Sequence, residues 1–249
     1  MKKIFILFLA IIILCFYGCT AVNYTFTQDG KTLGKGIGQV QLGVSAGSMY
    51  WEADSFDVVE LKNDETKLSP LLNLSVQGGI HDRIDIGGGM SVGLISINLR
   101  FFPKFSLFSN EKKYGISYMP VAGITWMPDT LLGLSNEGLK AHTWSLYHTF
   151  PMNIDVNDKM VLTAQALAGK EESSVTLLLG NDQGKIYKFI REVKGFSLGL
   201  RYRIKERSSI HPEISFISYD SGKPIIVYGI SGIIALGENK LSKLKEVNW

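Results

Sequence analysis

The chain has 249 residues, with 26 Lys and Arg against 23 Asp and Glu, and 45% of its residues are hydrophobic. This length is enough for one large domain with its own core, so a disulfide framework is not required. The near-neutral charge argues against a nucleic-acid partner, which would need a clustered basic face. Glycine is abundant, at 26 residues, and proline is scarce, at 7. That balance favours twisted, closely packed strands over a disordered chain.

The first segment has the features of an export signal. Lys2 and Lys3 precede an uncharged run over 4–17, which is shorter than the roughly 20 residues that span a hydrocarbon core. Gly18 and Cys19 follow at once and resemble a bacterial lipobox, in which the cysteine is acylated, for example with palmitate. We therefore expect 1–18 to be a signal peptide and Cys19 to be a lipidation site.

Two other interpretations of this segment stay open. Cleavage after Ala21 fits a small-x-small pattern, and the segment would also serve as an uncleaved anchor. Thr20 stands where many lipoproteins of the inner membrane have Asp, so the resemblance implies the outer membrane and the lipoprotein-sorting machinery as a partner. Removing 1–18 also removes Cys15 and two lysines, which leaves 24 basic against 23 acidic residues, a net charge of +1.

Period-two alternation of apolar and polar residues dominates the rest of the chain, as half-buried strands require. We expect a polar, Gly-rich tether over 19–37, a β domain over 38–237, and a polar C-terminal tail over 238–249. A short helix is expected in a loop near 129–139, and the Lys-rich tail from Asn239 to Trp249 is expected to be either a helix or disordered. The expected strands are 38–48, 70–80, 83–92, 94–102, 114–126, 140–150, 159–169, 195–205, 211–219 and 225–236.

Long and short connections alternate along the chain. The long ones fall near 49–69, 127–139 and 170–194, and the short ones include the turn at 81–82. Long loops at one end and short turns at the other are typical of bacterial outer-membrane barrels. We predict an all-β fold, an antiparallel up-and-down β-barrel of about 10 strands (8–12).

One stretch carries a resemblance to a known class of proteins. The sequence from Gly78 to Gly87, Gly-Gly-Ile-His-Asp-Arg-Ile-Asp-Ile-Gly, resembles the tight periplasmic turn of small bacterial outer-membrane β-barrel proteins of the porin or OmpA type. Leu99 to Pro103 resembles the end of a following strand in them. The resemblance implies an outer-membrane location, membrane lipid as a partner, and the barrel-assembly machinery as another.

The alternation assigns a face to each strand residue. In a barrel, apolar residues such as Leu42, Leu74, Trp126 and Leu198 would meet lipid, and polar residues would fill a small interior, where they must pair. The expected interior polar network is Asp85, Arg100, Arg201, Arg203 and Glu213. We expect Arg203 to pair with Glu213 and Arg100 with Asp85. This network is either structural filling or a site for a solute or ligand.

The segment 225–236 favours a rival architecture. Ile225 to Tyr228 and Ile233-Ile234 are apolar on both faces, which suits a strand buried on both sides. The alternative is therefore a periplasmic, lipid-anchored β-domain that binds an apolar ligand or a partner protein.

The sequence offers no catalytic constellation. Its four histidines are scattered, and Gly87-Gly88-Gly89 lacks the Lys and Ser or Thr of a phosphate-binding loop. We expect no enzyme, no cofactor and no metal site. The function predicted from the sequence is a structural, surface-exposed or small-solute role in the cell envelope, without catalysis.

Overall fold

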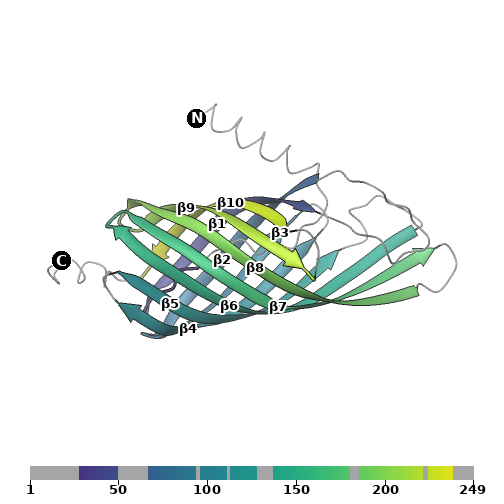
Figure 1. Ribbon diagram of the computed structural model, residues 1–249, viewed down its shortest axis with the longest axis horizontal. Coiled ribbons are helices and arrows are strands. Elements are labelled where there is room, and N and C mark those ends of the chain that lie inside the picture. The colour runs from purple at the N-terminus through teal and green to yellow at the C-terminus, as the bar shows by residue number, and fades with distance from the viewer. Residues whose placement is uncertain are drawn as a thin grey trace, which may run out of the picture.

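The protein is a closed barrel of ten antiparallel strands (Figure 1). The computed structural model describes residues 28–49, 67–93, 96–110, 113–127, 137–179, 185–220 and 224–237. The strands are β1 (Gly38–Met49), β2 (Lys67–His81), β3 (Ile84–Val92), β4 (Ile97–Asn110), β5 (Tyr114–Met127), β6 (Glu137–Asn157), β7 (Met160–Leu179), β8 (Lys185–Lys205), β9 (Ser208–Tyr219) and β10 (Ile225–Leu236).

Each strand pairs with its neighbours in sequence, and β1 pairs with β10 to close the sheet. The closing register runs from Gly38 opposite Leu236 to Gly47 opposite Val227. Closure leaves the described sheet without an unpaired edge strand, which is the condition for a strand-built protein to cross lipid. The predicted fold class is confirmed.

The two ends of the barrel differ, and we name them by their connections. The turn end carries the short connections 82–83, 111–113, 158–159 and 206–207, and the loop end carries the others, including 50–66 and 128–136. β1 begins and β10 ends at the turn end, because the number of strands is even. The expected helix at 129–139 falls mostly outside the described residues, as do the signal peptide, Cys19 and the tail over 238–249.

Three strands are longer than the sequence pattern predicted by nine or ten residues each. β6, β7 and β8 have 21, 20 and 21 residues, and they run past the rest of the barrel rim at the loop end (Figure 1). The expected long connection at 170–194 was wrong, because the strands continue through it and only 180–184 connect them. We call 137–140, 170–179 and 185–192 the β6–β8 extension. The extension was not predicted because its charged residues, such as Lys170 and Glu172, break the apolar alternation.

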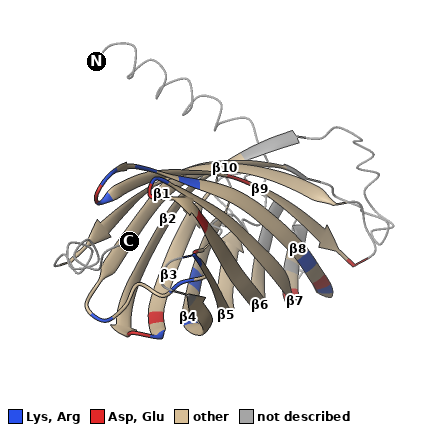
Figure 2. Cartoon of the chain, turned by 60° about the vertical axis from the view of Figure 1, so that its left-hand side comes forward, with Lys and Arg blue, Asp and Glu red and all other residues tan. Residues whose placement is uncertain are grey.

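The outward face of the barrel is apolar. Large hydrophobic side chains that are more than a third exposed occur on all ten strands, among them Leu42, Leu74, Trp126 and Leu198, as expected. Figure 2 shows charged residues at the hairpin turns and on the outlying part of β8, while the middle of most strands is tan. In the part of the chain that the structure describes, no helix is long and apolar enough to span a bilayer.

Glycines on the inward face make room for large side chains opposite them. A Cβ placed on Gly87 would lie 2.3 Å from Cε2 of Phe102 and 2.9 Å from the backbone oxygen of Val76. The ring of Phe102 therefore occupies the place where a side chain at position 87 would be. Gly78, on the outward face of the neighbouring strand opposite Ile86, has no atom within 4 Å of the place where a Cβ would be.

The two glycines give a matched test of this packing. We expect Gly87→Ala to lower the free energy of unfolding by about 1–3 kcal/mol, because the interior is already full. Gly78→Ala should leave it unchanged or slightly raised, since alanine loses less backbone entropy in a strand. Denaturant unfolding followed by tryptophan fluorescence measures both. Equal stability of the two variants would contradict the packing of Phe102 over Gly87.

Candidate functional site: the lumen and its N-terminal segment

Residues 28–37, the second half of the expected tether, lie inside the barrel at the turn end. We call them the N-terminal segment. Gly36 N–H donates to the Gly79 carbonyl at 2.9 Å, and Gly79 N–H donates to the Ile37 carbonyl at 2.8 Å. A Cβ on Gly79 would lie 1.9 Å from the Gly34 carbonyl oxygen. The absence of a side chain at Gly79 thus lets the segment cross close to β2 before β1 begins.

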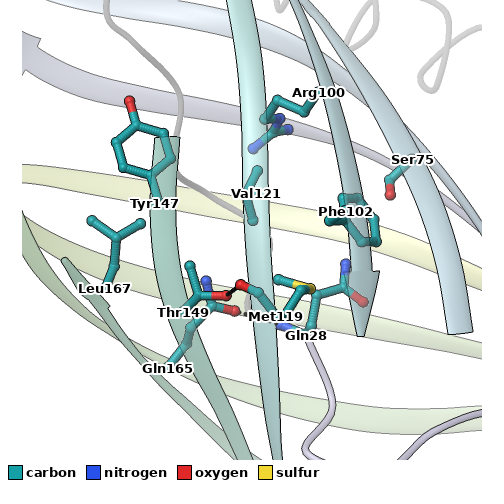
Figure 3. Close-up of a pocket in the computed structure, with 10 residues that line it drawn as sticks. All are labelled: Gln28, Ser75, Arg100, Phe102, Met119, Val121, Tyr147, Thr149, Gln165 and Leu167. Carbon is teal, nitrogen blue, oxygen red and sulfur yellow. Dashed lines mark hydrogen bonds between the residues drawn. The ribbon is translucent and has the colours of Figure 1, made fainter. Parts of the chain in front are cut away.

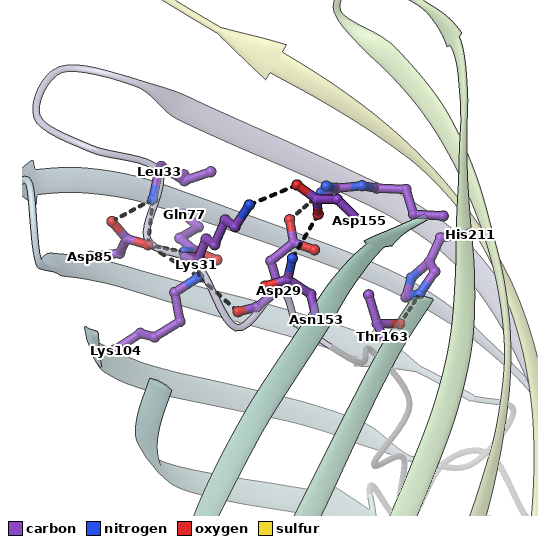
Figure 4. A network of polar contacts seen from close by, with 11 residues as sticks. Asp29, Lys31, Leu33, Gln77, Asp85, Lys104, Asn153, Asp155, Thr163 and His211 are labelled. Atoms are coloured by element: carbon purple, nitrogen blue, oxygen red, sulfur yellow. Dashed lines mark hydrogen bonds and ion pairs between the residues drawn. The ribbon is translucent and has the colours of Figure 1, made fainter. Parts of the chain in front are cut away.

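A fully buried ion pair near the turn end of the lumen holds this segment. Lys104 Nζ lies 3.2 Å from Asp85 Oδ2, and these side chains are only 1% and 0% exposed. The Asp85 carboxylate also accepts from Gln77 Nε2 at 2.5 Å and from the Leu33 N–H at 3.0 and 3.1 Å. Lys104 donates to the Lys31 carbonyl at 2.9 Å. The buried pair therefore fixes the backbone of the N-terminal segment on both sides (Figure 4).

Further polar contacts continue along the segment toward its N-terminal end. Lys31 Nζ lies 2.7 Å from Asp155 Oδ2, and Asp29 forms an ion pair with Arg201. The Gly30 carbonyl accepts from Ser117 Oγ at 2.5 Å. Ion pairs and hydrogen bonds thus hold the N-terminal segment against the barrel wall. The turn end of the lumen is therefore occupied by the chain's own residues.

The middle of the lumen holds a small cavity. Its volume is about 30 Å³, which is room for about one water molecule. Gln28 reaches it from the N-terminal segment, and its backbone N–H donates to Gln165 Oε1 at 3.1 Å. The other lining residues, shown in Figure 3, are Ser75, Arg100, Phe102, Met119, Val121, Tyr147, Thr149, Gln165 and Leu167.

The loop-side half of the lumen is more apolar. Phe102, Met119, Val121, Tyr147, Val193, Ile217 and Val227 form one buried cluster, with Leu167, Tyr219 and Ile225 against it. A polar group caps the cluster: Tyr147 donates to the buried Glu171 at 2.5 Å, and Arg191 lies 3.5 Å from the same carboxylate. The Arg191 guanidinium also lies 4.9 Å from the ring centre of Tyr219. Such a cation–π contact adds to the ion pair.

The structure places the sequence-predicted network residues in different settings. Asp85 and Glu213 are buried, Arg100 and Arg201 are half-buried, and Arg203 is exposed. In each of the two expected pairs, the predicted partner lies four residues along its strand from the residue that is opposite in the structure. Asp85 lies opposite Lys104, with Arg100 four residues further along β4, opposite Gly89.

Glu213 lies opposite Gly199, four residues from Arg203. An even offset keeps the face and changes the partner, so face assignment succeeded where register did not. Lys104 was not predicted as a partner, because the resemblance places a strand end at Pro103, next to it. The partner of Arg201 was also missed, because Asp29 was assigned to the tether.

The described residues give little support for a metal site or a catalytic histidine. They contain no group of three or more His, Cys, Asp and Glu that could hold a metal ion. His211 is buried, and its Nε2 lies 2.9 Å from Thr163 Oγ1, beside Gly199. Both neighbours belong to the barrel wall, so this histidine is part of the luminal packing.

Known proteins resemble the chain in fold alone. No family model matches it, and no curated protein does. The outer-membrane protease OmpT from Escherichia coli is 10% identical, with a TM-score of 0.51, over 84% of this chain and all of that one. Ail, the attachment invasion locus protein of Yersinia pestis, is 10% identical over 81% of this chain and 99% of its own, with a TM-score of 0.34. The first match shows that this barrel architecture occurs in a bacterial outer-membrane protein.

The two lysines of the site test which contact holds the lumen together. We expect Lys104→Met to cost about 3 kcal/mol or more of unfolding free energy, because it leaves Asp85 buried without its cation. Lys31→Met should cost less than about 1 kcal/mol, since its pair with Asp155 is partly solvated. Denaturant unfolding of the two purified variants measures the difference. Similar losses in both would show that Asp85 does not depend on Lys104.

Proposed function

We propose that the protein is an integral outer-membrane β-barrel with a closed lumen and a structural or surface-binding role, without catalysis. The observation that supports this most directly is the contrast between its two faces. Large apolar side chains face outward on every strand, while the inward face carries the buried Asp85–Lys104 pair and many buried Ser, Thr, Asn and Gln. A water-soluble domain has the opposite arrangement, with apolar residues inside.

The height of the apolar surface fits a bilayer. Along β8, the outward positions Phe196, Leu198, Leu200, Tyr202 and Ile204 are apolar, and the next outward positions toward the loop end are Lys194 and Glu192, both exposed. Ten strand residues tilted by about 40° cover about 25 Å, the height of a lipid-facing band. The charged positions fit the level of the lipid headgroups, so the β6–β8 extension would stand outside the membrane.

The filled lumen supports a role other than free diffusion of solutes. The N-terminal segment occupies the turn end, and the cavity in the middle of the lumen has room for about one water molecule. The β6–β8 extension then offers the most exposed surface for a binding role, including the side chains of Ile186, Lys188 and Ile190.

The rival function, a lipid-anchored soluble β-domain, was motivated by the two-sided apolar strand at 225–236. In β10, Tyr228, Ile230 and Ile234 face outward, while Val227 packs in the luminal cluster. The inward apolar residues therefore have partners inside a barrel, and this strand no longer favours the rival.

Arginine at two outward positions of β8 separates the two functions. Leu198 and Ile190 share one face and are 46% and 70% exposed. In a membrane barrel, Leu198→Arg should cost about 2–4 kcal/mol of unfolding free energy in lipid vesicles, and Ile190→Arg about 0–1 kcal/mol. In a soluble domain both would be tolerated alike. Two equally stable variants would therefore refute the membrane-spanning proposal.

Electrical recording tests the closed lumen. The purified protein, inserted into a planar bilayer, should give no steady single-channel conductance, because the N-terminal segment occupies the turn end of the lumen and the mid-lumen cavity has room for about one water molecule. Slower migration in gels after boiling than before shows that the inserted material is a folded barrel. Steady conductance from such material would mean that the lumen is an open solute path.

A further inference from the structure

The β6–β8 extension has an open strand edge. β8 pairs with β9 only from Val193, opposite Tyr219, toward the turn end, whereas its pairing with β7 continues to Lys185, opposite Leu177. β9 itself ends at Tyr219. Along 185–191, no described residue pairs with β8 on the side where β9 would lie. The extension, which runs past the rim in Figure 1, therefore exposes one edge of β8.

Asp220 marks the point where this edge begins. Its N–H donates to the Glu192 carbonyl at 2.8 Å, and its Oδ1 accepts from the Glu192 N–H at 2.9 Å. The φ angle of Asp220 is 48°, which lies in the left-handed region and turns the chain out of the extended conformation. The chain therefore makes its last contact with β8 at Glu192 and turns away.

The bonds of Glu192 show which backbone groups point to the open edge. In an antiparallel sheet, a residue directs its N–H and C=O to one neighbouring strand, and the next residue directs them to the other. Because Glu192 bonds on the β9 side, Ile190, Lys188 and Ile186 direct their backbone groups to that side too. These three residues lie about 7 Å apart along the strand. They form a template to which another strand can add.

The side chains beside this edge are apolar. Ile190 is 70% exposed and Ile186 is 66% exposed, which makes them the two most exposed large hydrophobic side chains in the described part of the chain. In the proposed function they lie beyond the headgroup-level Glu192 and Lys194, so lipid does not cover them. Lys188 lies between them on the same face and is also exposed. Apolar side chains that neither lipid nor core covers favour a protein partner.

A second copy of the chain is a poor occupant of the edge. Every copy in one membrane runs β8 from the loop end to the turn end, so two copies there cannot align their edges antiparallel. Copies in two apposed membranes can align. However, the register that places Ile186 opposite Ile190 then places Lys188 opposite the same lysine of the other copy, and like charges directly opposite are destabilising.

We propose that the edge of β8 at 186–190 binds an extended segment of a different protein, which adds to the β6–β8 extension as a further strand. Backbone hydrogen bonds to Ile186, Lys188 and Ile190 hold the segment. Its side chains opposite these residues are apolar, acidic and apolar, because matched apolar pairs and opposite charges stabilise cross-strand neighbours. The inference rests on the proposed function, in which the extension stands outside the membrane, and it gives the partner's chemistry.

A fluorescent peptide, Thr-Ile-Thr-Glu-Thr-Ile-Thr, tests strand addition on the purified full chain in lipid nanodiscs. We expect a saturable rise in fluorescence anisotropy at peptide concentrations below about 1 mM. Methyl groups on the backbone nitrogens of the glutamate and one isoleucine, which would face β8, should weaken binding about tenfold or more, because two hydrogen bonds are lost.

The matched control peptide carries its two methyl groups on the threonines that flank the glutamate. The nitrogens of these threonines would point away from β8, so this peptide should bind as the unmethylated one does. Absence of saturable binding, or equal weakening by the two methylation patterns, would overturn strand addition.

Substitutions of Lys188 test the same contact from the side of the protein. Lys188→Pro removes one N–H from the open edge and none from the bonds to β7, as edge strands tolerate, and should weaken peptide binding about tenfold. Lys188→Ala keeps the N–H and should weaken it less than about threefold, since an exposed charge pair contributes little. Equal binding by both variants would argue against backbone recognition. Slower gel migration after boiling than before shows that each is folded, and the methylated peptides decide the question if the proline variant is not.

Peptide binding to cells separates this inference from the proposed function. Intact cells that make the chain should bind the fluorescent peptide, and cells that make the Lys188→Pro variant should bind about tenfold less. If the purified chain binds but only permeabilised cells do, strand addition stands and the outward orientation of the extension is wrong. If neither binds while Leu198→Arg still destabilises the barrel in vesicles, strand addition is wrong and the membrane barrel stands.

Discussion

The pairing of β1 with β10 is the constraint on which the rest of this structure depends. Once the sheet is closed, every strand has a neighbour on each side, and the outward face can be apolar without exposing backbone groups to lipid. Closure also fixes a lumen of limited width, because strand number and tilt set the diameter. The inward side chains must then fill that width and satisfy one another's hydrogen bonds.

The lumen meets this requirement in two ways along its length. Toward the loop end, large apolar side chains fill it, with inward glycines such as Gly87 making room for rings such as Phe102. Toward the turn end, polar side chains line the wall, and the N-terminal segment supplies the missing partners. Asp85, for example, accepts from Lys104 on the wall and from the Leu33 N–H on the segment. Removing the segment would leave part of this network unsatisfied, so it belongs to the fold.

The sequence predicted what depends on local pattern. The period-two alternation of apolar and polar residues predicted the ten strands, and it also predicted which face of each strand is apolar. It did not give the partners of Asp85 and Glu213, because register depends on turns and on packing across the lumen. It ended β7 early and began β8 late, because residues near Lys170 and Glu192 lie above the apolar band, where both faces of a strand can be polar.

The N-terminal segment shows the same limit most clearly. Gly30, Gly34 and Gly36, with the charged residues between them, have the composition of a flexible tether, and composition alone cannot distinguish a tether from a chain packed in a lumen. The glycines here allow close approach: a Cβ on Gly30 would lie 2.1 Å from the Gly115 carbonyl oxygen. The charges find partners only because the wall presents Asp155 and Arg201 at matching heights.

This placement also changes the argument about the expected lipid at Cys19. An acyl chain on the periplasmic side would add little to a barrel already held in the membrane by ten strands. A chain that climbs from Leu33 to Gln28 is directed away from that side. The contacts of this segment with Lys104, Asp155 and Arg201, rather than a lipid, hold it against the barrel wall.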